Sequence, residues 1–196
     1  MIKRFNDYDK TKAYSDFPTL PKGGYVCKVM GAAIENNGNG DYIKISFDIA
    51  EGEYAGFYAT DYRSQQTEDK KWRGNYLLNI PLDDGSERDG WTKRKFKTFT
   101  EALEDSNAGY HFDWDESKFK GKLFGGLFNQ REYKTRKGDY AWATNLAQVT
   151  TVEKVKTGDF KIPADRPAKN KTVAPATNSE GFMDVPAGAE EEGLPF

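Results

Sequence analysis

The sequence predicts a single, mainly β domain that contains one substantial helix and is followed by an acidic tail. Several segments alternate apolar and polar residues, as a strand with one buried face does, and one segment has apolar residues at helical spacing. From Glu180 onward the chain has five acidic residues and no basic residue. With 196 residues, the chain is long enough for one domain with a hydrophobic core and appendages.

Charge is divided unevenly along the chain. All 29 basic residues but only 26 of the 31 acidic residues precede Glu180, so the body is mildly basic although the net charge of the chain is −2. Such an asymmetry is typical of a folded domain with an interaction tail. Aromatic residues make up 14% of the chain, more than a small core needs, which predicts that some of them lie on the surface.

The first two strands are predicted from apolar patterning. Residues 1–20 have no clear periodicity and are predicted to form an N-terminal arm, which ends in a turn-forming segment. Residues 25–34 are rich in apolar side chains and predict a first strand. Residues 43–49 alternate apolar and polar side chains and predict a second strand, joined to the first by a polar, glycine-containing loop at 35–41.

A third strand is predicted at residues 54–63. In an extended conformation Tyr58 and Tyr62 lie on one face of this segment, and Gly56 predicts a bulge or bend. Residues 65–90 mix basic, aromatic and turn-forming residues, and we interpret them as an insertion.

One helix and two further strands are predicted after the insertion. Residues 91–107 have three apolar side chains on one helical face, namely Phe96, Phe99 and Leu103. Residues 121–130 and 140–149 return to alternation and predict two strands. Residues 151–156 predict a short helical turn.

The same patterns predict how the chain is divided. Residues 21–163 form the folded domain. From residue 164 onward the composition is too poor in large apolar residues to fold, so 164–189 is predicted to be a disordered linker. Residues 190–196 form an acidic tip that is predicted to bind other proteins.

Three strands, a helix and two strands are the element order of the five-stranded oligonucleotide-binding barrel, the OB-fold. In that fold the helix lies between strands three and four, and the ligand crosses the face of strands two and three between two loops. We expect those loops at residues 36–41 and 134–139. Other small β-rich domains with one helix share this element order, so the barrel is a hypothesis.

Aromatic and basic residues interleave on the predicted ligand face, as single-strand binding requires. Aromatic rings stack on bases without selecting sequence, at about 1–3 kcal/mol per base, while cations contact the backbone. The residues with this interleaving are Tyr42, Lys44, Tyr58, Tyr62, Arg63, Lys71, Trp72, Arg73 and Tyr76. For any one of these aromatic residues, the alternative is packing in the core or across strands.

Two basic clusters are candidates for the two ends of the same groove. They are Lys93, Arg94 and Lys95 at the start of the predicted helix, and Lys134, Arg136 and Lys137 in the second loop. Cations in the first turn of a helix oppose its macrodipole, which favours a role in phosphate binding. The alternative for both clusters is a solvated surface.

Enzymatic signals are weak, so we predict a protein that is not an enzyme and has neither cofactor nor metal. The single cysteine, Cys27, excludes an internal disulfide and a thiolate zinc cluster made by one chain. A phosphate-binding G-x-x-x-x-G-K-[ST] loop is absent from the sequence. His111, Asp113, Asp115 and Glu116 lack known ligand spacing and predict a structured loop, with a metal-dependent nuclease as the alternative.

Membrane insertion is not predicted. The sequence contains neither an apolar run of membrane-spanning length nor a signal-peptide core, so we expect a cytoplasmic location and no membrane partner.

Four segments of the body carry a family resemblance. They are E-G-E-Y at 51–54, D-K-K-W-R-G at 69–74, W-T-K-R at 91–94 and G-D-F-K-I-P at 158–163. Across residues 20–163 the chain resembles single-stranded DNA-binding proteins encoded by bacteriophages and mobile elements of Gram-positive bacteria. The resemblance implies single-stranded DNA as the ligand and the cytoplasm of a bacterial host as the location, and it assigns no roles to single residues.

The last seven residues carry a second resemblance. They combine three acids, a glycine and an apolar end, in the order Glu190, Glu191, Glu192, Gly193, Leu194, Pro195 and Phe196. An apolar plug beside negative charge suits docking into a pocket with a basic rim. The segment resembles the C-terminal tip of bacterial single-stranded DNA-binding proteins, although it has Glu where those tips have mainly Asp. The resemblance implies replication and recombination proteins as partners of the tip.

The patterns and the two resemblances together predict a sequence-tolerant single-stranded DNA-binding protein with a recruiting tail. One alternative is an adaptor of the replication or recombination machinery whose body binds protein. Because tails of this kind often belong to oligomers, formation of a homo-oligomer stays open.

Overall fold

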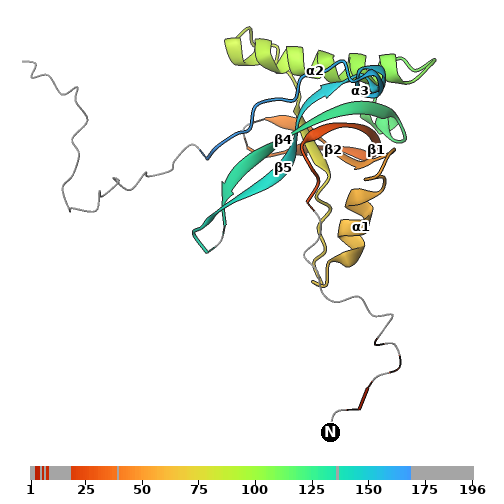
Figure 1. The fold of residues 1–196 in the computed structure, drawn as a ribbon. Coiled ribbons are helices and arrows are strands. Elements are labelled where there is room, and N and C mark those ends of the chain that lie inside the picture. The colour runs from red at the N-terminus through yellow and green to blue at the C-terminus, as the bar shows by residue number, and fades with distance from the viewer. Residues whose placement is uncertain are drawn as a thin grey trace, which may run out of the picture.

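Five antiparallel strands form one strongly curved sheet, with helices at its two ends (Figure 1). The computed structural model describes residues 3, 4, 6, 8, 19–38, 40–135 and 137–168. Most of the predicted arm, most of the predicted linker and the whole tip at 190–196 lie outside the described residues.

The strands lie in the order β3-β2-β1-β4-β5 across the sheet. Their bounds are β1 Gly23–Asn36, β2 Asp41–Ile49, β3 Asn75–Asn79, β4 Leu123–Lys134 and β5 Tyr140–Thr150. Register shifts interrupt the β1–β2 pairing near Val29 and the β4–β5 pairing near Phe128. Such irregularities bend strands and increase their twist, which accounts for the curvature.

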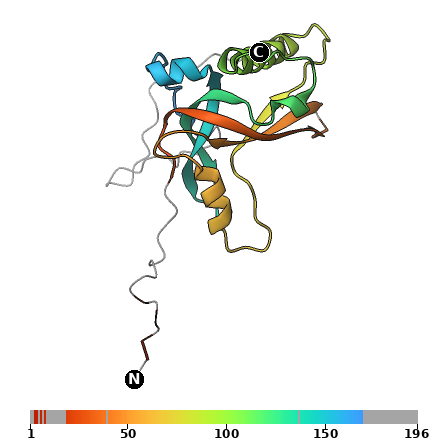
Figure 2. The same ribbon diagram turned by 90° about the vertical axis from the view of Figure 1, so that its right-hand side faces the viewer.

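Helices cover the two ends of the curved sheet (Figure 2). They are α1 Phe57–Ser64, α2 Glu87–Ser106, the short 3-10 helix η1 Glu116–Phe119, and α3 Val152–Thr157. The core between the sheet and α2 is built largely from phenylalanine rings that are fully buried, namely Phe47, Phe99, Phe119, Phe124 and Phe128. The rings meet mostly edge to face, an arrangement that aromatic pairs favour.

The prediction of a mainly β domain is confirmed, and so are four of its strand positions and its long helix. The helix begins at Glu87, before the predicted start, because the Ser86 side chain accepts a hydrogen bond from the Asp89 backbone N–H at 3.1 Å and caps it. The predicted helical turn at 151–156 is also present as α3. The sheet is not closed into a barrel, because β3 and β5 stand at its edges without pairing in the described part of the chain.

The predicted third strand at 54–63 is wrong, because this segment is a turn followed by α1. Tyr54, Tyr58 and Tyr62 are four residues apart, a spacing that fits a helix as well as an alternating strand. Gly56 adopts a left-handed conformation, with φ 72°, and starts the helix in place of the predicted bulge.

The third strand is instead β3, which lies inside the predicted insertion at 65–90. This strand has only five residues, and of its two leucines Leu78 is buried while Leu77 is exposed. So short a segment shows little periodicity in the sequence.

The Asp48 carboxylate joins β2 to α1. Its oxygens accept hydrogen bonds from the backbone N–H groups of Ile49 at 2.8 Å, Tyr58 at 2.9 Å and Ala59 at 3.0 Å. Asp48 is buried, and two of these donors belong to the first turn of α1. Asp48 therefore serves as the cap that Gly56 cannot provide.

Replacing Asp48 by alanine is expected to lower the free energy of unfolding by about 2 kcal/mol, because it leaves buried N–H groups without an acceptor. Asp48→Asn keeps one carbonyl oxygen and is expected to lie between alanine and wild type. Urea unfolding followed by circular dichroism measures both changes. Asp139→Ala, in the exposed loop before β5, is the control and should shift stability by less than about 0.5 kcal/mol; an equal effect of both alanine variants would contradict the capping role.

Candidate nucleic-acid interface

The β4–β5 hairpin extends beyond the rest of the sheet (Figure 1). β1 pairs with β4 at residues 123–128, whereas β5 pairs with β4 as far as Lys134. An isolated bridge between Arg131 and Arg166 borders the other edge of this extension. We call residues 131–142 the hairpin arm.

Three aromatic side chains of the hairpin arm are partly exposed. Tyr133 and Trp142 are each 46% exposed, and Tyr140 is 36% exposed. Lys134 lies opposite Tyr140 in the antiparallel register, and Glu132 lies opposite Trp142. Lys134, Tyr140 and Trp142 therefore share one face of the arm, and Tyr133 lies on the other.

The exposed surface of the hairpin arm is basic. Residues 131–140 include four basic and two acidic residues. One of the acids, Glu132, is buried and accepts a hydrogen bond from the Ala168 backbone N–H at 3.2 Å. Lys134 and Lys137 are exposed, while Arg136 lies outside the described residues.

A groove of about 380 Å³ separates the hairpin arm from α1. Tyr133 and Trp142 line its arm side, and Phe57 and Arg73 line its helix side. The Arg73 guanidinium is ion-paired with Asp61 at 2.9 Å, yet its side chain is 64% exposed. This arm groove combines aromatic rings with a cation, the two components of a site for a single strand.

A second hollow, of about 760 Å³, lies at the opposite edge of the hairpin arm. It is formed between the arm and the segment 166–168, and its basic and aromatic lining residues are Arg131, Tyr133, Lys134, Tyr140 and Arg166. Tyr133 lines both hollows, so the arm presents aromatic and basic groups along both of its edges.

Several predicted ligand-face residues gather at the end of α1 and on the loop that follows it. The Tyr62 and Trp72 rings lie 6.0 Å apart, and the Lys70 ammonium is 6.0 Å from the Tyr62 ring centre. Arg63 donates to the Ala59 carbonyl of its own helix at 3.2 Å, and Lys71 is ion-paired with Asp69 at 3.2 Å. Tyr62, Arg63, Lys71 and Arg73 are surface residues here, as predicted.

Trp72 has a structural role that the sequence did not reveal. Its indole N–H donates to the carbonyls of Phe47 at 3.1 Å and Gly74 at 3.0 Å, and the ring packs against the core. The half-buried ring holds the loop onto the end of β2.

Tyr58 is corrected from a candidate stacking residue to a core residue, and Tyr76 is a partly buried residue that packs against the core. Tyr58 is only 7% exposed and packs edge to face on Phe47. Tyr76 stacks on Phe99 with ring centres 5.8 Å apart. Burial raises the pKa of both phenols above the ordinary value, so the hydroxyls stay protonated. The Tyr58 ring therefore has no free face for a base, and the Tyr76 ring has one face against Phe99.

Tyr42 and Lys44 share the outer face of β2, as predicted, but an acid accompanies them. Glu35 of β1 accepts hydrogen bonds from the Tyr42 hydroxyl at 2.8 Å and the Lys44 ammonium at 3.1 Å. The Tyr42 bond, and then the Lys44 bond, lowers the pKa of Glu35, and the same contact raises the pKa of Tyr42. The carboxylate offsets the charge of Lys44, so this face is less suited to phosphate than the hairpin arm.

The cations of α2 lie away from the hairpin arm. α2 crosses one end of the molecule and the arm projects from the other, so the structure does not bring the two basic clusters to one groove (Figure 1). Lys93 is ion-paired with Asp83 and Asp89, and hydrogen bonds to these acids, Asp83 first, raise its pKa. Arg94 lies over the Trp91 ring at 4.5 Å, and Lys95 is exposed.

The prediction that Lys93, Arg94 and Lys95 lie in the first turn of the helix and oppose its macrodipole is also wrong. Because the helix begins at Glu87, Lys93, Arg94 and Lys95 lie beyond its first turn. The first turn instead contains the acids Glu87 and Asp89, which the macrodipole stabilises.

The acidic stretch around His111 forms a structured loop. Lys118 is ion-paired with Asp113 and lies 3.8 Å from Asp115, and its contact lowers the pKa of Asp113. Asp115 also caps η1 through the Ser117 backbone N–H at 3.0 Å. Among the described residues, no three His, Cys, Asp or Glu side chains are grouped so as to hold a metal ion.

Sequence reasoning missed the aromatic residues of the hairpin arm. Tyr133 and Tyr140 flank the basic loop that was singled out, and Trp142 follows at the alternating spacing of the predicted last strand. Rings at both ends of a basic hairpin loop were a signal that could have identified this surface.

No protein-family model matches the chain, and the search of curated proteins also finds no match. Within the part of the chain that the structure describes, no helix is long and apolar enough to cross a bilayer.

Trp72→Phe and Trp142→Phe are expected to separate a structural from a surface tryptophan. The first removes a donor that serves two carbonyls and should lower the free energy of unfolding by about 1–2 kcal/mol. The second changes a half-exposed side chain and should change stability by less than about 0.5 kcal/mol. Thermal unfolding of both variants measures the difference, and equal losses would contradict the assignment.

Proposed function

We propose that the chain binds single-stranded DNA along the hairpin arm and the arm groove, with little sequence preference. The observation that supports the proposal is the placement of partly exposed Tyr133 and Trp142 rings among cations on an arm that projects from the sheet. Bases stack on such rings whatever their identity, and cations neutralise the backbone phosphates.

A single strand fits this surface better than a duplex. The rings offer stacking faces only to bases that are unpaired and unstacked, and those of a duplex already stack on each other. The arm and α1 are the two walls of the arm groove, which places rings and a cation within reach of a strand that lies between them.

We also propose that the sheet is a variant of the oligonucleotide-binding barrel. Five strands in the order β3-β2-β1-β4-β5 can close only if the edge strands β3 and β5 pair, and that barrel fold is itself partly open. The hairpin arm contains the loop between strands four and five, one of the two loops that bind ligand in that fold.

The tail has a separate role in the proposal. The tip at 190–196 recruits replication or recombination proteins, since its three glutamates and apolar end suit a basic-rimmed pocket. Pull-down with the full chain and with a tip-deleted chain tests this role, and equal recovery of partners by both would contradict it.

Labelled oligothymidine should bind the full chain, and binding should weaken with salt. For a single strand, the logarithm of the affinity falls by about 0.7 per log unit of salt for each phosphate neutralised. Fluorescence anisotropy at several salt concentrations measures the slope, with duplex DNA and an RNA strand as parallel probes. Salt-independent binding, or tighter binding to duplex, would contradict the proposal.

Trp142→Ala is expected to weaken oligothymidine binding between about 5-fold and 150-fold, which corresponds to about 1–3 kcal/mol for one lost stacking contact. Lys134→Ala should reduce the salt slope by about 0.7.

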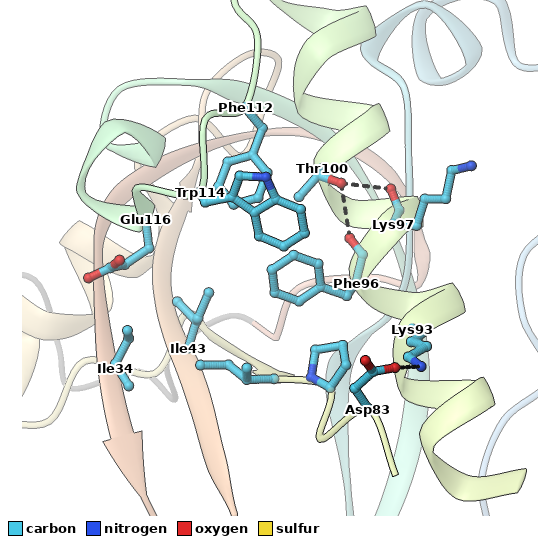
Figure 3. Close-up of a pocket in the computed structure, with 12 residues that line it drawn as sticks. Ile34, Ile43, Asp83, Lys93, Phe96, Lys97, Thr100, Phe112, Trp114 and Glu116 are labelled. Atoms are coloured by element: carbon cyan, nitrogen blue, oxygen red, sulfur yellow. Dashed lines mark hydrogen bonds and ion pairs between the residues drawn. The ribbon is translucent and has the colours of Figure 1, made fainter. Parts of the chain in front are cut away.

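Trp114→Ala is the matched control, because Trp114 is exposed on the loop before η1 and lies beside α2, and α2 is at the other end of the molecule from the arm (Figure 1 and Figure 3). It should leave the affinity unchanged. If the arm variants fold and bind the strand as wild type does, the hairpin arm is not the strand-binding surface. If the wild-type chain folds but does not bind the strand, the protein-binding adaptor is favoured. Cleavage of the probe with Mg²⁺ would instead favour the nuclease.

A further inference from the structure

A hollow of about 720 Å³ lies between α2, the first two strands and the loop before η1 (Figure 3). We call it the α2 pocket. Its lining is predominantly apolar and includes Ile34, Ile43, Ile80, Phe96, Phe112 and Trp114. A hollow of this size and lining is suited to an apolar group.

Trp114 stands at the α2 pocket with an unusual backbone. Its φ is 68°, a left-handed value that bulky side chains rarely adopt, and its side chain is 81% exposed. One ring face stacks on Phe96 at 6.2 Å, with an interplanar angle of 14°. The structure thus holds a large apolar ring beside an apolar hollow at a cost in backbone strain. Because strained backbone conformations cluster at functional sites, we interpret this hollow as a binding surface.

The border of the pocket on α2 is basic. Residues 87–97 contain five basic residues and two acids. One of these acids, Asp89, is buried and ion-paired with Lys93 at 2.9 Å. Lys93 and Lys97 line the pocket, together with two carboxylates, Asp83 and Glu116. Lys93 is ion-paired with Asp83, and Lys97 with Glu101 of the next turn of α2 at 3.5 Å.

We infer that the α2 pocket binds the tip of the same chain, with the apolar segment 194–196 in the hollow and the acidic segment 190–192 over the basic surface of α2. The apolar end of the tip matches the predominantly apolar hollow, and the three glutamates before it match the segment 87–97 of α2, which carries five basic residues against two acids. Of these cations, Lys93 and Lys97 line the hollow itself. The inference is independent of the DNA-binding proposal, since the pocket lies on a different surface from the hairpin arm.

The chain is long enough to place its tip there. The described residues end at Ala168, and 28 residues follow. By random-coil scaling, 28 residues have an end-to-end distance of about 30 Å, whereas a folded domain of about 150 residues has a radius of gyration of about 15 Å. Tethering raises the local concentration of the tip to the millimolar range, which favours the chain's own tip over that of a second copy.

Occupation of the pocket would regulate the tip. A protein partner must take the tip from the α2 pocket, so recruitment becomes a competition between two pockets for one peptide. The strand-binding surface stays accessible in either state, because it lies at the other end of the molecule.

Disulfide trapping in the full chain tests the inference. Gly193→Cys leaves the apolar end intact, and Glu116→Cys provides a partner at the pocket. The control pair joins Gly193→Cys to Glu68→Cys, which replaces an exposed glutamate on the loop after α1. The native Cys27 is fully buried and does not compete. The pocket pair should form an intramolecular disulfide about tenfold faster than the control pair, as seen on non-reducing gels and by mass spectrometry.

Two further changes test the chemistry of the contact in the pocket pair. Phe196→Ala removes the apolar anchor, and Ile34→Asp places a repelling charge at a position that is 52% exposed and therefore tolerates it. Each should reduce trapping to the control rate, while thermal unfolding confirms that the variants fold. Saturating oligothymidine should leave the trapping rate unchanged.

Equal trapping rates in the pocket and control pairs would overturn the inference. Disulfide-linked dimers as the main product would also overturn it, because the occupant would then be the tip of a second copy. Loss of trapping on addition of oligothymidine would place the tip in the strand-binding groove instead. The comparison of the pocket pair with the control pair, and the effects of Phe196→Ala and Ile34→Asp, are measured without DNA, so they fail or succeed separately from the proposed function.

Discussion

Two consecutive residues at the end of β2 hold together the part of the structure that forms the arm groove. The Asp48 carboxylate accepts the first N–H groups of α1, and the Phe47 carbonyl accepts the indole N–H of Trp72. Within α1, the buried Asp61 binds Arg73 at 2.9 Å and so fixes the cation on the helix side of the groove. The groove therefore depends on hydrogen bonds to buried acceptors, which are costly to leave unsatisfied.

The sequence predicted those elements whose burial follows a simple period. β2 and α2 each bury one face along most of their length, so alternation and helical spacing identified them. α1 was wrongly predicted as a strand because the tyrosines in and before it repeat every four residues, a spacing that fits both a helix and an alternating strand. Its cap, Asp48, lies on β2 and so could not be recognised next to the helix in the sequence. β3 was missed because an edge strand of five residues with one buried leucine has hardly any period to detect.

The sequence predicted the types of residue that form the candidate site, but only some of their positions in the structure. Interleaving of aromatic and basic residues predicts stacking platforms on the ligand face, yet Tyr58, Tyr76 and Trp72 pack their rings in or against the core. Sequence position cannot decide this allocation, since it depends on which face of α1 and β3 meets Phe47 and Phe99. The basic loop of the hairpin arm was identifiable because its cations lie together in the sequence.

The separation of the hairpin arm from the α2 pocket bears on how an acidic tail and the proposed strand-binding surface can coexist in one chain. Glutamates of the tail would compete with phosphates for the cations of the arm, and tethering would strengthen that competition. Charges in solution are screened over about 8 Å at physiological salt, so a tip held on α2 exerts little effect on the other end of the molecule. A tip anchored by apolar contacts also stays bound as salt rises, whereas a tip held only by charge is released. The proposed docking in the α2 pocket would thus remove the acidic tip from the proposed strand-binding surface over the range of salt in which that surface is itself expected to bind.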